Sequence, residues 1–203
     1  MQYITLPPAN SQPPTGLVVT LHGWGANAED VAGLVPHLNL PNYHFVLPNA
    51  PFPFPHSPLG RAWYDLSVEN IYQGLEESRE ILLKFLLSLE ASTGVPLSRT
   101  VLSGFSQGGA MTLDVGSKLP LAGLVVMSGY LHPDALSTKN NLPPILIMHG
   151  RRDEVVPLQA AATARDTVAS LGVVAEYHEF DTGHEINLQM LNVARNFILK
   201  RIA

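Results

Sequence analysis

The chain has 203 residues, of which only 14% are charged, and its formal net charge at pH 7 is −5. Its few basic residues are scattered along the chain, which does not suit a protein that binds nucleic acid or an anionic membrane surface. It contains no cysteine, which excludes disulfides, a cysteine nucleophile and thiolate metal ligands.

The length predicts a single domain over residues 1–203, because a chain of this size buries about 70% of its unfolded surface around one core. The segment 1–8 has neither the basic region nor the long apolar run of a secretory signal. Apolar runs such as 121–127 are far shorter than the roughly 20 residues of a membrane-spanning helix. We therefore expect a cytoplasmic protein without a transmembrane segment.

Short segments rich in Val, Ile and Leu alternate with longer helical patterns along the chain. The predicted strands are 16–21, 44–47, 100–103, 123–127, 145–148 and 175–180. The predicted helices are 28–38, 68–90, 109–119, 158–171 and 185–202. Runs that are apolar throughout indicate strands buried on both faces of a parallel sheet. The alternation predicts an α/β fold with a mostly parallel central sheet and helices on both of its faces.

The first predicted strand is followed by His22-Gly23-Trp24-Gly25. The two glycines allow the backbone to approach a ligand closely, so the Trp24 N–H is a candidate hydrogen-bond donor to a substrate. We expect the His22 side chain to order this loop rather than to take part in chemistry.

Aromatic residues gather after the second predicted strand. The segment 48–58 holds five of the 17 prolines together with Phe52 and Phe54, and it is too apolar to be a disordered linker. Trp63 and Tyr64 follow it. With Trp24, these residues are expected to line an apolar substrate groove. Each of them could instead pack beneath its own loop.

The segment Gly104-Phe105-Ser106-Gln107-Gly108 follows a predicted strand and precedes a predicted helix. This G-x-S-x-G pattern is typical of a nucleophile elbow, a sharp turn that exposes a serine hydroxyl beyond the sheet. Side chains at 104 and 108 would collide in such a turn, which explains the two glycines. The Gln107 N–H, at the helix N-terminus, would stabilise an oxyanion together with the Trp24 N–H. The pattern predicts a serine hydrolase.

A serine nucleophile of this kind needs a histidine base that follows it in the sequence. The histidines after Ser106 are His132, His149, His178 and His184. The first three lie in a loop before proline, at a strand end and within a strand, so we expect packing or loop roles for them. His184 follows the last predicted strand, where Gly183 lets the chain bend tightly. We therefore predict that His184 is the base.

The acid that orients this base is expected in a loop that follows a strand. Asp153 meets this condition, because it leaves the predicted strand 145–148 and precedes a helix that starts near Pro157. Its carboxylate would accept the imidazole N–H and stabilise the imidazolium. Glu154 and Asp181 are the nearest alternatives.

Two other carboxylates between the serine and the histidine lie within predicted helices. Asp114 and Asp166 have this position, and we expect both to be solvated or capping residues. A carboxylate on a helix surface is poorly placed to hold the base.

With these segments placed, the chain resembles the small carboxylesterases and acyl-protein thioesterases, the phospholipase/carboxylesterase family of the α/β-hydrolases. The matching segments span nearly the whole chain and are 21–25, 48–51, 63–65, 104–109, 149–157 and 183–184. The resemblance implies an α/β-hydrolase fold without a large cap domain. It also implies catalysis by Ser106, Asp153 and His184, with oxyanion-hole N–H groups from Trp24 and Gln107. Arg151 and Arg152 replace the small or acidic residues that relatives commonly carry before the acid.

The leading hypothesis is an enzyme that hydrolyses carboxylic esters or thioesters through an acyl-enzyme, without a metal or an organic cofactor. Its substrate would be a small-molecule or lipid-like acyl ester or an acylated protein, and it would be a monomer or a homodimer.

The sequence favours this hypothesis over three others. A catalytically silent binding module of the same fold would usually have lost one of the proposed site residues, and this chain keeps all of them. An enzyme like the dienelactone hydrolases is disfavoured because those enzymes use a cysteine nucleophile. A metallohydrolase built on His22, His149, Asp153 and His184 is disfavoured because their spacing is not that of metal ligands.

Overall fold

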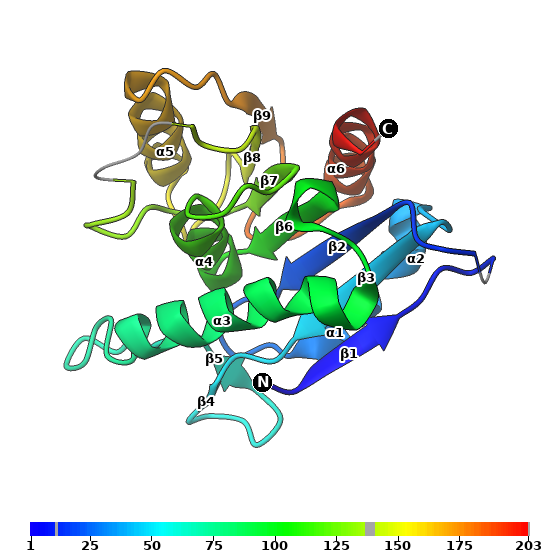
Figure 1. Cartoon of the computed structure of the whole chain (residues 1–203). Coiled ribbons are helices and arrows are strands. Elements are labelled where there is room, and N and C mark those ends of the chain that lie inside the picture. The colour runs from blue at the N-terminus through cyan, green and yellow to red at the C-terminus, as the bar shows by residue number, and fades with distance from the viewer. Residues whose placement is uncertain (11, 137–140, 203) are drawn as a thin grey trace.

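The computed structural model of the protein describes residues 1–10, 12–136 and 141–202. Within these residues, one sheet has seven strands in the spatial order β1-β3-β2-β6-β7-β8-β9 (Figure 1). The strands are Tyr3–Leu6 (β1), Gly16–Leu21 (β2), Tyr43–Pro48 (β3), Thr100–Phe105 (β6), Gly123–Met127 (β7), Ile145–Gly150 (β8) and Glu176–Phe180 (β9). Only β1 is antiparallel to its neighbour in this sheet. The predicted mostly parallel sheet is therefore confirmed.

Helices cover both faces of the sheet, and each face has its own hydrophobic cluster. One face carries α3 (Leu75–Thr93), α4 (Gln107–Gly116) and α5 (Leu158–Ser170); the other carries α1 (Ala28–Ala32), α2 (Val35–Leu38) and α6 (Leu188–Arg201). Leu17 and Val19 of β2 belong to the first cluster and Val18 to the second, as side-chain alternation along a strand requires. In Figure 1, α3 crosses in front of the sheet. Within the described residues, none of the helices has the length and apolar composition that a membrane span requires.

Two predicted helices are shorter than the sequence pattern suggested. The predicted helix 28–38 is divided into α1 and α2, because Pro36 has no N–H for a helix interior and is tolerated only in the first turn of a new helix. The predicted helix 68–90 starts only at Leu75, after Gly74 with a φ of +86°. The residues before Gly74 form turns instead.

The sequence pattern did not indicate β1 or the pair of short strands after β3. β1 is an edge strand of four residues whose side chains are exposed or half-buried, so it has no continuous apolar run. The short strands are β4 (Phe52–Pro53) and β5 (Arg61–Ala62), which pair within the proline-rich region. The Arg61 guanidinium orders this region by donating hydrogen bonds to the carbonyls of Ala50 (2.9 Å) and Pro51 (2.6 Å).

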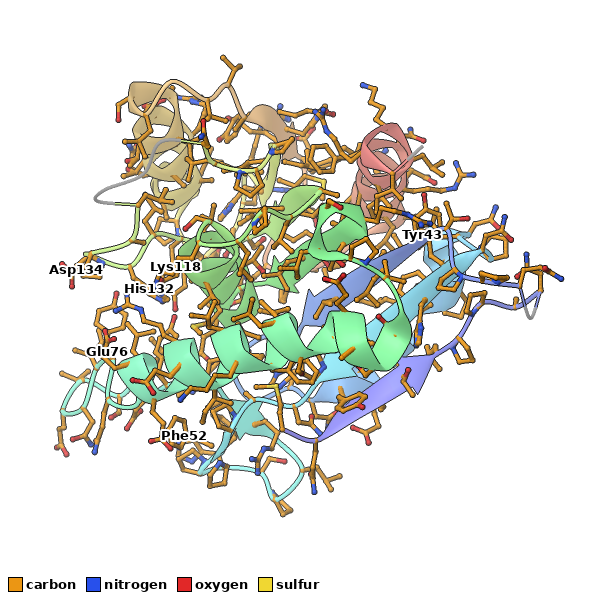
Figure 2. All side chains as sticks on the ribbon, in the orientation of Figure 1. Tyr43, Phe52, Glu76, Lys118, His132 and Asp134 are labelled. Atoms are coloured by element: carbon orange, nitrogen blue, oxygen red, sulfur yellow. The ribbon has the colours of Figure 1, made fainter. Side chains whose placement is uncertain are left out.

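Asp114 of α4 is buried rather than solvated, which corrects the expectation from the sequence. Its carboxylate accepts hydrogen bonds from Arg79 Nε (2.7 Å) and His132 Nδ1 (2.6 Å), and Lys118 Nζ lies at 3.1 Å. Figure 2 labels Lys118 and His132 beside one another. Burial raises the pKa of Asp114, but the hydrogen bonds from His132 and Arg79 outweigh it and lower the pKa to about 2.

We expect Asp114→Asn to lower the free energy of unfolding by about 3 kcal/mol at pH 7, because it removes the buried counter-charge of the Arg79 guanidinium. The pKa of Asp114 is lowered in the folded state, so its contribution is present above the ordinary value of 3.8 and is lost as the pH falls through about 2. Urea unfolding between pH 7 and pH 2 measures this effect. The difference in free energy of unfolding between wild type and variant should shrink only below about pH 4.

Asp166→Asn is the matched control, because Asp166 also lies on a helix but is exposed and is paired with its neighbour Arg165. Its unfolding should match that of the wild type at every pH. Equal losses of unfolding free energy in Asp114→Asn and Asp166→Asn would contradict the role given to Asp114.

Candidate active site

Ser106 occupies a strained turn between β6 and α4. Its backbone has φ 54° and ψ −117°, a conformation that residues other than glycine rarely adopt. A Cβ added at Gly104 would lie 2.2 Å from the Gly108 carbonyl oxygen, and one added at Gly108 would lie 2.5 Å from the carbonyl oxygen of His22. Both glycines are therefore required by close backbone contacts, as the elbow pattern suggested.

A continuous line of hydrogen bonds joins the three candidate site residues. Ser106 Oγ lies 3.0 Å from His184 Nε2, and His184 Nδ1 lies 2.7 Å from Asp153 Oδ2. The three residues follow β6, β9 and β8, so they meet at the carboxyl ends of the strands. Ser106 and Asp153 are buried, and the His184 side chain is 17% exposed. In this arrangement the imidazole can accept the serine proton while the carboxylate holds its other nitrogen.

The loops that carry the acid and the histidine run side by side. The Arg151 N–H donates to the Phe180 carbonyl (2.8 Å), and the Arg152 N–H donates to the Thr182 carbonyl (3.0 Å). A Cβ at Gly150 would lie 2.3 Å from the Gly183 carbonyl oxygen, so only glycine permits this approach. This contact brings the loop after β8 within reach of His184.

Each oxygen of the Asp153 carboxylate has its own partners. Oδ1 accepts the N–H groups of Val155 (2.9 Å) and Val156 (2.8 Å), while Oδ2 faces His184. Burial raises the pKa of Asp153, but the hydrogen bonds from His184, Val156 and Val155 outweigh it and leave the pKa below its ordinary value. The carboxylate is thus ionised at neutral pH, with one oxygen directed at the imidazole.

The structure places the alternative carboxylates away from this role. Glu154 is exposed beside Asp153, and Asp181 is exposed and forms an ion pair with Arg151 Nη1 at 2.9 Å. Arg151 Nε also pairs with Glu179, at 3.0 Å, so these two carboxylates neutralise the arginine charge next to the site.

The other three histidines after Ser106 are engaged elsewhere. His132 is bonded to Asp114, and His178 Nε2 lies 3.0 Å from a carboxylate oxygen of Glu176. His149 is fully buried; its Nε2 lies 2.8 Å from the Val156 carbonyl and 3.4 Å from Asp153 Oδ2. Across the described chain, no three His, Asp or Glu side chains gather in a way that could hold a metal ion.

The backbone N–H groups of Trp24 and of Gln107, the first residue of α4, are both without an acceptor among the described residues. The loop after β2 packs closely on the serine, since a Cβ at Gly23 would lie 3.4 Å from Ser106 Cβ. Both N–H groups are therefore available to a substrate oxygen.

His22 orders this loop, as expected from the sequence. Burial lowers its pKa, so the imidazole is neutral at pH 7. Its Nε2 accepts the Ala50 N–H (3.0 Å), which leaves Nδ1–H to donate to the Gly23 carbonyl (2.7 Å). The side chain thus links the loop after β2 to the proline-rich region.

A hollow of about 310 Å³ lies beside Trp24. Its walls include Trp24, Phe52, Pro55, Tyr64, Asp65 and Glu77. Phe52 is labelled in Figure 2. Phe54, which the sequence also predicts in the groove, is not part of these walls; it packs edge-on against the Trp24 ring at a centroid distance of 5.0 Å. The loop after β2 thus contributes Trp24 to a mainly apolar hollow.

Trp63 is fully buried and offers no surface to a substrate, contrary to the groove role expected for it. Its indole is drawn inward by a hydrogen bond from Nε1 to the His22 carbonyl (3.0 Å). Tyr64 borders the hollow but is also buried, and its hydroxyl is bonded to His132 Nε2 (2.7 Å) and the Tyr130 hydroxyl (2.6 Å). Sequence alone could not place these rings, because their partners lie far away along the chain.

Known proteins resemble this chain over most of its length. The sequence profile of the family described as Phospholipase/Carboxylesterase matches residues 8–202. Acyl-protein thioesterase 1 of Neurospora crassa is 29% identical, over 93% of this chain and 87% of the relative. Acyl-protein thioesterase 1 homolog 2 of Dictyostelium discoideum is 32% identical, over 78% of this chain and 76% of the relative. The crystal structure of esterase PE8 matches with a TM-score of 0.90 and 33% identity, over 98% of both chains.

Proposed function

The chain belongs to the phospholipase/carboxylesterase family, and from this we propose that it cleaves carboxylic esters and thioesters through an acyl-enzyme formed on Ser106. Membership of the family makes the protein a carboxylic ester hydrolase. The residue roles and steps are our proposal. The observation that carries them is the line of hydrogen bonds from Ser106 through His184 to the buried Asp153.

Attack on the substrate starts with transfer of the Ser106 proton to His184. Asp153 accepts the Nδ1–H of the imidazole, which fixes the tautomer with an unprotonated Nε2 directed at the serine. Ser106 Oγ then bonds to the acyl carbon while Nε2 takes the hydroxyl proton. The imidazolium that forms is stabilised by the Asp153 carboxylate.

The negative oxygen of the tetrahedral intermediate would be held by the N–H groups of Trp24 and Gln107. Donors fixed by the backbone need no reorganisation when charge develops, and the loss of one such donor typically costs about 10² to 10³ in rate. The position of Gln107 at the start of α4 adds the positive end of the helix dipole.

The intermediate collapses when His184 returns its proton to the departing alkoxide or thiolate. Water then attacks the acyl-enzyme, with His184 again acting as the base, and releases the acid and free Ser106. All of these proton transfers use one nitrogen, Nε2, which faces Ser106.

The substrates proposed are lipid-like acyl esters and acylated proteins. The hollow beside Trp24 has mainly apolar walls that suit an acyl or other apolar substrate group. The relatives from Neurospora crassa and Dictyostelium discoideum carry the name acyl-protein thioesterase, which favours thioesters as well as oxygen esters.

A panel of p-nitrophenyl esters and matched acyl thioesters of increasing chain length tests this function. We expect turnover of both classes, unchanged by a chelator, because no step requires a metal. Binding of acyl compounds without any turnover would support a silent binding module instead, and loss of turnover with chelator would support a metallohydrolase.

A further inference from the structure

Trp63 is hydrogen-bonded to the two segments that carry the proposed oxyanion donors, the start of α4 and the loop after β2. Its backbone N–H donates to Gln107 Oε1 (2.9 Å), and its indole Nε1–H donates to the His22 carbonyl (3.0 Å). Its carbonyl accepts a hydrogen bond from Ser78 Oγ of α3. Trp63, Gln107 and Ser78 are fully buried, and His22 is nearly so. Each polar group of this one residue is thus fixed by a different segment of the chain.

These partners are adjacent to both proposed oxyanion donors. Gln107 supplies one donor from its own backbone, and its side chain is held by the Trp63 N–H and by donation from Nε2 to the Tyr64 carbonyl (2.8 Å). His22 stands two residues before Trp24, which supplies the other donor. Trp63 therefore connects the start of α4 to the loop after β2.

A second contact anchors the same segment further along α4. The Tyr64 hydroxyl is bonded to His132, which is bonded in turn to Asp114. Gln107 and Asp114 lie seven residues apart, on the same side of the helix. The segment 63–64 is therefore attached to α4 directly at Gln107 and, about two turns further along, through His132 at Asp114.

We infer that Trp63 is a positioning residue for the oxyanion hole, fixing the Trp24 N–H relative to the Gln107 N–H. The inference rests on the function proposed above. Donors must lie about 2.7 to 3.1 Å from the developing oxyanion, so a small displacement of one of them weakens stabilisation of the transition state. Trp63 holds that separation, because its backbone N–H is bonded to the Gln107 side chain and its rigid indole is bonded to the His22 carbonyl. Packing alone would not require its Nε1–H to reach the carbonyl of His22.

Trp63→Phe tests this inference, because it keeps an aromatic ring and the backbone N–H but removes the Nε1–H donor. We expect kcat to fall about 10-fold to 100-fold with little change in KM, a smaller loss than removal of a donor itself. An alkyl boronic acid, which forms a tetrahedral adduct on the serine, should lose affinity by a similar factor. The pH dependence of kcat/KM should not move, since the Asp153–His184 pair is untouched.

Tyr43→Phe is the matched control. The Tyr43 hydroxyl is buried and donates to the Ile202 carbonyl (3.0 Å), so this change also removes one buried side-chain donor to a backbone carbonyl. Tyr43 is labelled in Figure 2, far from His132. Its replacement should lower stability but leave kcat and boronic acid affinity unchanged.

Ser78→Ala removes the hydrogen bond from α3 to the Trp63 carbonyl. This variant tests the inference if Trp63→Phe does not fold. A fall of a few-fold in kcat, with a parallel loss of boronic acid affinity, is expected. Wild-type values in a folded Trp63→Phe protein, or losses as large in Tyr43→Phe, would overturn the inference. Failure of the proposed function would look different, because the wild type itself would then show neither turnover nor boronic acid binding.

Discussion

Ser106→Ala is expected to lower kcat for ester hydrolysis by a factor of about 10³ to 10⁶ while the protein stays folded. The substitution removes the oxygen that would form the acyl-enzyme. It leaves the glycines that permit the turn, and among the described residues the side-chain hydrogen bond that it removes is the one to His184. Steady-state kinetics, with urea unfolding as the check on folding, measure both parts of this expectation.

Ser128→Ala provides a closely matched control. Ser128 follows the neighbouring strand β7, also has a positive φ (48°), is fully buried, and its Oγ is without a partner among the residues described. Its replacement should leave kcat near the wild-type value. Activity retained in Ser106→Ala, or lost equally in Ser128→Ala, would remove Ser106 from the role of nucleophile.

Asp153→Asn is expected to lower kcat by about 10² to 10⁴. In the wild type, Oδ1 accepts the N–H groups of Val155 and Val156. An asparagine would keep its oxygen there and turn its NH₂ group toward His184. Nδ1 would then have to accept, Nε2 would carry the proton, and the imidazole could not take the proton of Ser106. Kinetics on the purified variant measure the loss.

Glu154→Gln is the comparison for this prediction, because Glu154 is the adjacent carboxylate and is exposed. It should have little effect on kcat, and its unfolding should match that of the wild type. If Glu154→Gln were the more damaging change, the assignment of the acid would be wrong.

The parts of the molecule that could be predicted from sequence are those with local causes. The strands of the parallel sheet are continuous apolar runs, and the turn at Ser106 is dictated by Gly104 and Gly108 within five residues. The prediction of His184 also has a local cause, because the adjacent Gly183 lets the chain bend directly after the last strand. The edge strand β1 could not be predicted in this way, because it has only four residues and none of them is buried.

The errors concern side chains whose partners are distant in the sequence. The sequence predicts a solvated Asp114, but its carboxylate is bonded to Arg79 of α3 and to His132 of the loop after β7. Trp63 was expected in the groove, but the carbonyl of His22 draws its indole into the core. Asp114 lies four residues before Lys118, a spacing that is also common on exposed helix faces. The local sequence therefore gives no sign that Asp114 is buried.

The acyl-enzyme itself is tested most directly by mass spectrometry of the intact protein after reaction with a serine-directed fluorophosphonate. We predict a single adduct per chain, mapped to Ser106, absent from Ser106→Ala and still present in Ser128→Ala. Strong slowing of the labelling in Asp153→Asn would link the reaction to His184. An adduct on a different serine, or turnover that continues without any adduct, would contradict the proposed mechanism.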